Sequence, residues 1–173
     1  DKELLEIVLR NQTPLSEKAA FLGEKGGNPY YIFAFSLPLI VYGIGSKDKK
    51  ASALISDGIQ AAILTSSMVV VLKGLFQRYR PYQSNQPYHY GSLIKGDHYY
   101  SFPSGHTALA FSVATTIKKH TNKKLLKYLS YTLALGTAFS RVHDDKHWPS
   151  DVFIGALLGT VITEQLIKKQ KKR

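Results

Sequence analysis

Apolar and polar positions alternate along the chain in blocks, and the spacing inside these blocks predicts helices. Residues 1–22 carry leucine and valine at helical spacing and predict a short amphipathic helix. An uncharged apolar run follows over residues 29–45, and a second run over residues 51–72 contains Asp57 as its single charge. The same pattern predicts three further helices, at roughly 105–119, 124–140 and 150–168.

Glycine, proline and tyrosine mark the expected connections. The stretch GEKGGNP, residues 23–29, predicts a link without regular structure, and residues 82–102 predict a long loop rich in tyrosine and histidine. We therefore expect one all-α domain, a helical bundle of about five core helices after a short N-terminal amphipathic helix. Its expected parts are an N-terminal segment 1–28, a helical core 29–168 and a basic tail 169–173.

The length of the apolar runs fits either a membrane protein or a soluble bundle, and charge placement favours the membrane. If successive helices alternate in direction, 13 of the 23 lysines and arginines gather at one end, in residues 47–50, 118–127 and 168–173. An excess of this kind at alternate connections is typical of the positive-inside rule. In a soluble bundle the same lysines would be solvated turns, and the acidic residues inside the apolar runs favour that alternative.

Composition and charge exclude some kinds of site and binding partner. The 173 residues include no cysteine, which excludes disulfides and cysteine-based metal sites, and the formal net charge is +11. Such a charge is compatible with nucleic-acid binding, but its placement at alternate helix connections indicates a membrane, so we expect no nucleic-acid partner. The alternative from another class is a non-catalytic basic protein that binds a membrane or nucleic acid through its lysine clusters.

Three clusters of chemically reactive residues fall at the sparsely basic end of this bundle. The first, KGLFQRYRP, places Lys73 and Arg80 seven residues apart, so both are expected on one face of a helix. The second, SFPSGH at 101–106, predicts a turn that enters a helix, whose free amides and positive dipole end suit an anion. The third, SRVHDDKHWPSD, covers residues 140–151.

Together the clusters supply what phosphoryl transfer requires. The cations Lys73, Arg80 and Arg141, with backbone amides, can neutralise the three equatorial oxygens of the transferred group. Asp151 follows His147 by four residues, so its carboxylate can reach one ring nitrogen and leave the other free to attack phosphorus.

The order and spacing of the three clusters resemble a known family. The residues that carry the resemblance are Lys73-x6-Arg80-Pro81, Pro103-Ser104-Gly105-His106 and Ser140-Arg141-x5-His147-x3-Asp151. They are similar to the three-part motif of the type 2 phosphatidic acid phosphatase superfamily, which includes bacterial acid phosphatases and vanadium haloperoxidases. The resemblance covers about residues 29–168. Membrane members usually have six transmembrane helices, so the first would be missing here or replaced by residues 1–22.

The resemblance implies a role for each matching position. His147 would be the nucleophile that forms a phosphohistidine, Asp151 its orienting partner, and His106 the general acid for the leaving oxygen. The phosphoryl group would be held by Lys73, Arg80, Ser104, Gly105 and Arg141. No metal and no other cofactor is expected in this scheme.

One position departs from the family pattern. Family members often carry glycine two residues before the nucleophilic histidine, and here that residue is Asp145, next to Asp144. Two carboxylates beside an anion site oppose phosphate unless they point away or pair with a neighbouring cation. His143, these two aspartates and His147 could also be a metal cluster, although four residues so close in one loop rarely converge on one ion.

Several other residues have an expected environment but no assigned role in the reaction. Asp57 should face the bundle interior because a carboxylate is costly in lipid, whereas His120 is expected to be solvated. Trp148 is expected to pack or to anchor at an interface. The tyrosines and histidines of 82–102 could select a lipid headgroup at the membrane interface or could pack over the bundle end.

We therefore expect a metal-independent phosphatase that hydrolyses a lipid phosphate monoester or pyrophosphate through a phosphohistidine. The expected location is a bacterial cytoplasmic membrane, with the site on the outer, periplasmic face. Phosphatidic acid, phosphatidylglycerol phosphate, undecaprenyl pyrophosphate and lipid A phosphates are all candidate substrates, and the residues do not choose among them. A soluble periplasmic acid phosphatase or a vanadium haloperoxidase would share the same site residues.

Overall fold

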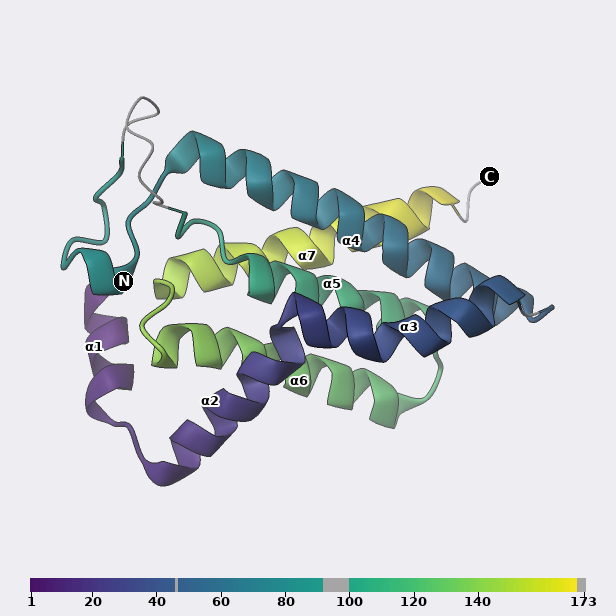
Figure 1. Ribbon diagram of the computed structural model, residues 1–173, viewed down its shortest axis with the longest axis horizontal. Coiled ribbons are helices and arrows are strands. Elements are labelled where there is room, and N and C mark those ends of the chain that lie inside the picture. Colours follow the sequence, from purple (N-terminus) through teal and green to yellow (C-terminus); the bar gives the residue numbers. More distant parts are fainter. Residues whose placement is uncertain (46, 92–99, 171–173) are drawn as a thin grey trace.

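A computed structural model describes residues 1–45, 47–91 and 100–170 of the chain (Figure 1). The helices are α1 (Lys2–Arg10), α2 (Pro14–Gly27), α3 (Pro29–Gly45), α4 (Lys49–Phe76), α5 (Gly105–His120), α6 (Lys124–His143) and α7 (Pro149–Gln170), with a 3-10 turn η1 (Pro81–Gln83). In these ranges the one bridge outside helices and turns pairs Arg78 with Tyr90. The predicted all-α class is confirmed.

The long helices alternate in direction, as the interpretation of the charge pattern assumed. Figure 1 shows the ends of α4 and α6 and the starts of α5 and α7 together at one end of the bundle, which α1 crosses. The α3–α4 and α5–α6 connections lie at the opposite end, with the end of α7. The three motif clusters are therefore at one end of the molecule and the lysine-rich connections are at the other.

The N-terminal region differs from its prediction, because residues 23–27 continue α2 instead of forming a link. Their glycines allow α2 to touch α6. A Cβ built on Gly23 would lie 2.0 Å from the Gly136 carbonyl oxygen, and the Thr137 hydroxyl donates to the Gly23 carbonyl (2.9 Å). Close packing against α6 thus stabilises a helix that the intrinsic propensity of glycine disfavours.

The end of α4 also differs from its prediction. Gln77 adopts a left-handed conformation (φ 44°) and its amide donates to the Lys73 carbonyl (3.0 Å), which caps and ends the helix. Arg80 therefore follows the helix in an extended segment, so it does not share a helical face with Lys73. The two cations belong to different elements that meet at the same end of the bundle.

The tyrosine- and histidine-rich loop is described in part. His98 and Tyr99 fall within residues 92–99, which lie outside the described residues. In the described part, His89 stacks on Tyr79 with ring centroids 3.9 Å apart, and its Nδ1 is 3.1 Å from the Ser84 hydroxyl. These contacts support the packing interpretation for His89.

The bundle has a polar interior and an apolar exterior, which favours a membrane protein over a soluble bundle. Small hydroxyl residues are buried between the helices, for example Ser112 and Thr163, whose hydroxyls are 2.9 Å apart. Large apolar side chains point outward instead, among them Val70 (67 % exposed), Leu75 (66 %) and Phe153 (62 %). Among the described residues, α4 and α7 are long and apolar enough to cross a membrane. In water such an outer surface would be unfavourable, whereas lipid accommodates it.

Asp57 faces the interior, as predicted, but the expectation for His120 is wrong. The Nε2 atom of His120, at the end of α5, lies 2.8 Å from the Asp57 carboxylate on α4. Both residues are largely buried, so this pair satisfies a polar group that would otherwise be costly in an apolar helix.

The closest approach between α5 and α7 sets the distance between two of the motif clusters. A Cβ on Gly155 would lie 2.6 Å from the Ser104 carbonyl oxygen, and a Cβ on Gly159 would lie 2.1 Å from the Ala108 carbonyl oxygen. No side chain fits there, so the two backbones touch along this seam. The second motif and the start of α7 are therefore held in direct contact.

Replacing Gly159 with alanine should separate α5 from α7. We expect Gly159→Ala to destabilise the protein by about 1–3 kcal/mol, the usual cost of overpacking, and to lower the midpoint of thermal unfolding in detergent. Gly58→Ala is the matched control, because a Cβ there meets only Thr116 Cγ2 at an ordinary 3.6 Å. Equal midpoints for the two variants would contradict this account of the seam.

Candidate active site

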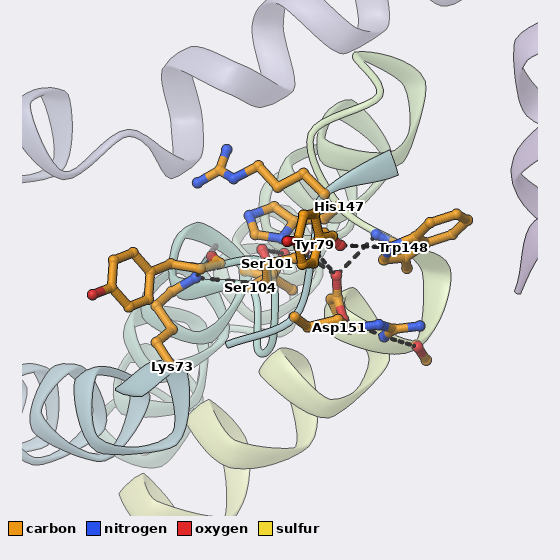
Figure 2. A network of polar contacts seen from close by, with 12 residues as sticks. Lys73, Tyr79, Ser101, Ser104, His147, Trp148 and Asp151 are labelled. Carbon is orange, nitrogen blue, oxygen red and sulfur yellow. Dashed lines mark hydrogen bonds and ion pairs between the residues drawn. The ribbon is translucent and has the colours of Figure 1, made fainter. Parts of the chain in front are cut away.

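Asp151 is the centre of the polar network at the motif end of the bundle (Figure 2). Its side chain is fully buried in the first turn of α7. One carboxylate oxygen accepts from the Ser101 hydroxyl and from the Trp148 amide (3.0 Å), and the other accepts from Arg78 Nη1 (2.5 Å). Both carboxylate oxygens thus accept hydrogen bonds, three in all, and these hold the orientation of the carboxylate.

His147 is the residue that this carboxylate faces. Its Nδ1 atom lies 3.6 Å from Asp151 Oδ2 and 3.5 Å from the Ser101 hydroxyl. The backbone of the loop is held by the Arg141 carbonyl, which accepts from the amides of Lys146 and His147 (3.0 Å each). None of these contacts uses Nε2, so the second ring nitrogen is available for chemistry.

The His147 ring is held in its neutral form. Burial lowers the pKa of His147 to about 4, the charges of Lys73 and Arg80 act in the same direction, and the Asp151 carboxylate opposes them. A neutral imidazole is the form in which a histidine nitrogen has a free electron pair, which nucleophilic attack requires.

The three predicted cations converge on the same end of the bundle. The Lys73 ammonium, on α4, donates to the carbonyls of Tyr100 and Ser101, the latter at 3.5 Å, just before the second motif. Arg141 is buried at the end of α6, where Glu24 (3.7 Å) and Asp144 (3.4 Å) flank its guanidinium. Arg80 lies close enough for its charge to lower the pKa of His147.

The second motif forms the predicted helix start. The first helical hydrogen bond of α5 runs from the Ala108 amide to the Ser104 carbonyl (3.0 Å), so the amides of Gly105 and His106 have no partner inside the helix. Ser104 itself is fully buried: its hydroxyl is 3.0 Å from the Thr107 hydroxyl, and its amide donates to the Asp151 carbonyl (2.9 Å). Ser104 therefore connects the start of α5 to the first turn of α7 through a backbone hydrogen bond.

His106 stands among the cations. Burial lowers the pKa of His106 to about 4, and the charges of Arg141, Lys73 and Arg80 lower it further in that order. Burial and these charges thus disfavour its protonated form. A bound anion would reverse this effect, because its negative charge offsets that of the three cations.

The acidic loop does not form the metal cluster that its composition allowed. His143 turns toward the N-terminal region, with Nδ1 3.0 Å from the Asp144 carboxylate and Nε2 3.4 Å from the Ser16 hydroxyl. Asp144 also flanks Arg141, so its charge is paired. Among the described residues, no group of three or more metal-ligating side chains converges.

Asp145 occupies a backbone conformation that explains the glycine preference at this position. Its φ is 56°, in the left-handed region, where glycine is unstrained and aspartate is tolerated better than most residues. The chain needs this turn to leave α6 and to present His147 two residues later.

Sequence reasoning missed several residues of the network. Arg78 and Asp1 were not singled out, nor was Glu24 as a partner of Arg141, and Ser101 was quoted without a role. For Arg78 the only signal was its place inside the first motif, at a position to which the motif assigns no role. Trp148 does pack, as expected: it is buried, and its ring nitrogen donates to the Tyr79 carbonyl (2.9 Å).

The arrangement thus combines a neutral, oriented histidine, a second histidine, three cations and a helix start at one end of an all-α membrane bundle. The PAP2 superfamily matches residues 58–173 as a family model, so all three motifs lie inside the match. The chain belongs to the PAP2 superfamily, the family indicated by its motifs.

Individual relatives agree with this assignment. The chain is 34% identical over 131 residues to a lipid A 1-phosphatase of Porphyromonas gingivalis, covering 73% of this chain and 26% of that protein. It is 28% identical over 162 residues to an undecaprenyl-diphosphatase of Sulfolobus acidocaldarius, and this match covers 93% of this chain and 74% of that protein. The chain thus spans about a quarter of the length of the Porphyromonas relative.

Among solved structures, LpxE of Aquifex aeolicus superposes with a TM-score of 0.71 at 27% identity. The match covers 96% of this chain and 93% of that one. The similarity therefore extends well beyond residues 58–173, which the family model matches.

The backbone at residue 145 yields a stability prediction. We expect Asp145→Ala to be less stable than Asp145→Gly by about 1 kcal/mol, because alanine is strained in the left-handed region and glycine is not. Asp145→Asn, which also removes the charge, should stay close to wild type. Thermal unfolding of the three variants in one detergent measures this, and an alanine variant as stable as the glycine variant would refute the backbone explanation.

The site also yields a titration prediction. In histidine-labelled protein, the His147 ring should remain neutral from pH 7 down to about pH 5, since its pKa is lowered to about 4. Replacing Lys73 with glutamine should move this titration to higher pH, because a nearby cation disfavours the charged ring. Nitrogen NMR follows both, with His147→Ala to assign the signal. A ring that titrates near 6.5 in wild type would contradict the burial argument.

Proposed function

We propose that this protein is a membrane lipid phosphatase that hydrolyses a phosphate monoester or diphosphate through a phosphohistidine at His147. The observation that carries the proposal is the His147–Asp151 pair. The carboxylate lies 3.6 Å from Nδ1 and is itself held by three donors, and none of these contacts uses Nε2. Such a pair fixes the tautomer whose free nitrogen can attack phosphorus.

The reaction follows from these positions. The Nε2 atom of His147 attacks phosphorus, the bond from phosphorus to the lipid oxygen breaks, and His106 gives its proton to that oxygen. Water then attacks the phosphohistidine and loses a proton to His106, the nitrogen–phosphorus bond breaks, and inorganic phosphate leaves. Lys73, Arg80, Arg141 and the free amides at the start of α5 stabilise the equatorial oxygens during both steps.

The proton of His106 is acquired with the substrate. Burial and three cations lower the pKa of His106 to about 4, so the ring is neutral at pH 7. A phosphate group bound among the cations adds negative charge beside the ring and favours its protonated form. This coupling would supply the acid only when there is a leaving group to protonate.

The names of the relatives support a lipid substrate. One is a lipid A 1-phosphatase and another an undecaprenyl-diphosphatase, and both names describe removal of phosphate from a lipid. The apolar exterior of the bundle supports the same conclusion and disfavours a soluble acid phosphatase. Phosphatidic acid, phosphatidylglycerol phosphate, undecaprenyl diphosphate and lipid A 1-phosphate form the panel of candidates.

Charge placement supports an orientation. The lysine-rich connections lie at the end opposite the site, and lysine-rich ends of membrane bundles face the cytoplasm. The site would then open on the outer face of a bacterial cytoplasmic membrane.

Replacing the nucleophile tests the mechanism. In detergent, with the four lipids of the panel, we expect His147→Ala to lower phosphate release roughly 10³-fold or more and His106→Ala roughly 10²- to 10⁴-fold. Wild-type protein quenched in alkaline detergent should retain labelled phosphate that acid removes. Activity should persist in the presence of a chelator.

His120→Gln is the matched control, because it changes a histidine at the far end and keeps a side chain that can bond to Asp57. It should retain near-wild-type activity. Wild-type-like phosphate release from His147→Ala, or activity that a chelator abolishes and magnesium restores, would overturn the proposal.

A further inference from the structure

We propose that Arg78 is a positioning residue of the site, which fixes the Asp151 carboxylate, and that Asp1 at the start of α1 in turn fixes Arg78. The inference rests on the proposed function, since it assigns Asp151 the task of orienting His147. It adds to the site a buried arginine that does not bind substrate, together with a contribution from the N-terminal helix.

The side-chain hydrogen bonds of Arg78 all go to oxygen atoms of the protein. The side chain is 3 % exposed. Its Nε donates to the Pro87 carbonyl (2.6 Å), its Nη1 to the Ser150 hydroxyl (2.7 Å) and to Asp151 Oδ1 (2.5 Å), and its Nη2 to Asp1 Oδ2 (2.7 Å). Four hydrogen bonds thus commit four of the five N–H donors of the guanidinium to protein oxygens, whereas a phosphate-binding arginine needs free donors.

Asp1 completes this arrangement. Its carboxylate accepts from Arg78 Nη2, from the Ser150 amide (2.9 Å) and from the Ser150 hydroxyl (2.5 Å). It thus stabilises the N-terminus of α7, the helix that carries Asp151, and pairs with the arginine that holds Asp151. Leu5 of α1 packs with Trp148 and Val152, so α1 also contacts the start of α7 through apolar side chains.

The buried charges explain why Arg78 is needed. A carboxylate with no exposure, as at Asp151, is costly unless a cation and hydrogen bonds compensate it. Ser101 and Trp148 each supply one donor to Oδ2, but in the described part of the chain Arg78 supplies both the donor to Oδ1 and the compensating charge. Without Arg78 the carboxylate would rotate or take up a proton, and either change would release His147 from its orientation.

A double-mutant cycle tests the inference in the full chain. We expect Arg78→Gln to lower kcat roughly 10- to 100-fold with KM nearly unchanged, as is usual for partners behind a reactive group. In an Asp151→Asn background the same change should have little further effect, because Arg78 acts through that carboxylate. Guanidinium ion should partly restore kcat in Arg78→Ala and should not do so in Asp151→Asn.

Asp1→Asn provides the second arm, with a smaller loss of kcat that disappears in the Arg78→Gln background. The controls are Glu3→Gln and Arg10→Gln, exposed residues of the same helix α1, which should leave kcat unchanged. Phosphate release from the lipid that wild type hydrolyses fastest is the readout, and thermal unfolding reports folding. If Arg78→Gln does not fold, the Asp1→Asn variant tests the inference instead: a lower kcat supports it and an unchanged kcat contradicts it.

The outcomes separate the two proposals. Additive losses in the cycle, a rise in KM alone, or unchanged kcat in folded Arg78 and Asp1 variants would overturn the role of Arg78. A fully active His147→Ala protein would overturn the proposed function itself. An inactive His147→Ala protein with a neutral Arg78→Gln variant would overturn only the inference made here.

Discussion

The buried carboxylate of Asp151 is the constraint on which the rest of the site depends. It accepts from the segment after α4 through Arg78, from the segment before α5 through Ser101, and from the start of α7 through the Trp148 amide. Three parts of the chain that are distant in sequence thus meet at one charge. Because a charge at this depth is tolerated only with all of its partners present, its burial makes the alignment of the three motifs a condition of folding.

The same principle operates throughout the bundle. Ser112 pairs with Thr163 between α5 and α7, and Asp57 pairs with His120 between α4 and α5, so polar contacts connect the helices inside. Large apolar side chains lie outside, where lipid is the natural surrounding. Glycine seams then bring the backbones into contact, and at Gly155 this contact involves the Ser104 carbonyl. Packing and catalytic geometry are therefore set by the same residues.

The sequence predicted the helices after residue 29 and the motif positions well, because apolar periodicity and motif spacing are local properties. It failed where tertiary contacts decide. The glycines of 23–27 predicted a link, but their contact with α6 makes this segment helical. Gln77 ends α4 before Arg80 because it adopts a left-handed backbone conformation, which its residue type does not predict. Arg78 occupies a position of the first motif to which the pattern assigns no role. Only the fold shows that Arg78 is committed to Asp151, and the role of Arg80 toward phosphate remains a prediction.

Charge compensation also explains how an anion site can contain a carboxylate. A free Asp151 would weaken the attraction of Lys73, Arg80 and Arg141 for phosphate, since like charges repel at short range. Arg78 compensates that carboxylate at Oδ1, at 2.5 Å, while Oδ2 lies 3.6 Å from His147 Nδ1. Burial lowers the pKa of both His106 and His147 to about 4, the charges of Lys73 and Arg80 act in the same direction on both rings, and Arg141 acts on His106 as well. Arg141 is itself paired with Glu24 and Asp144, so among the described residues Lys73 and Arg80 are the cations of the site without a carboxylate partner, and a phosphate group would compensate their charge.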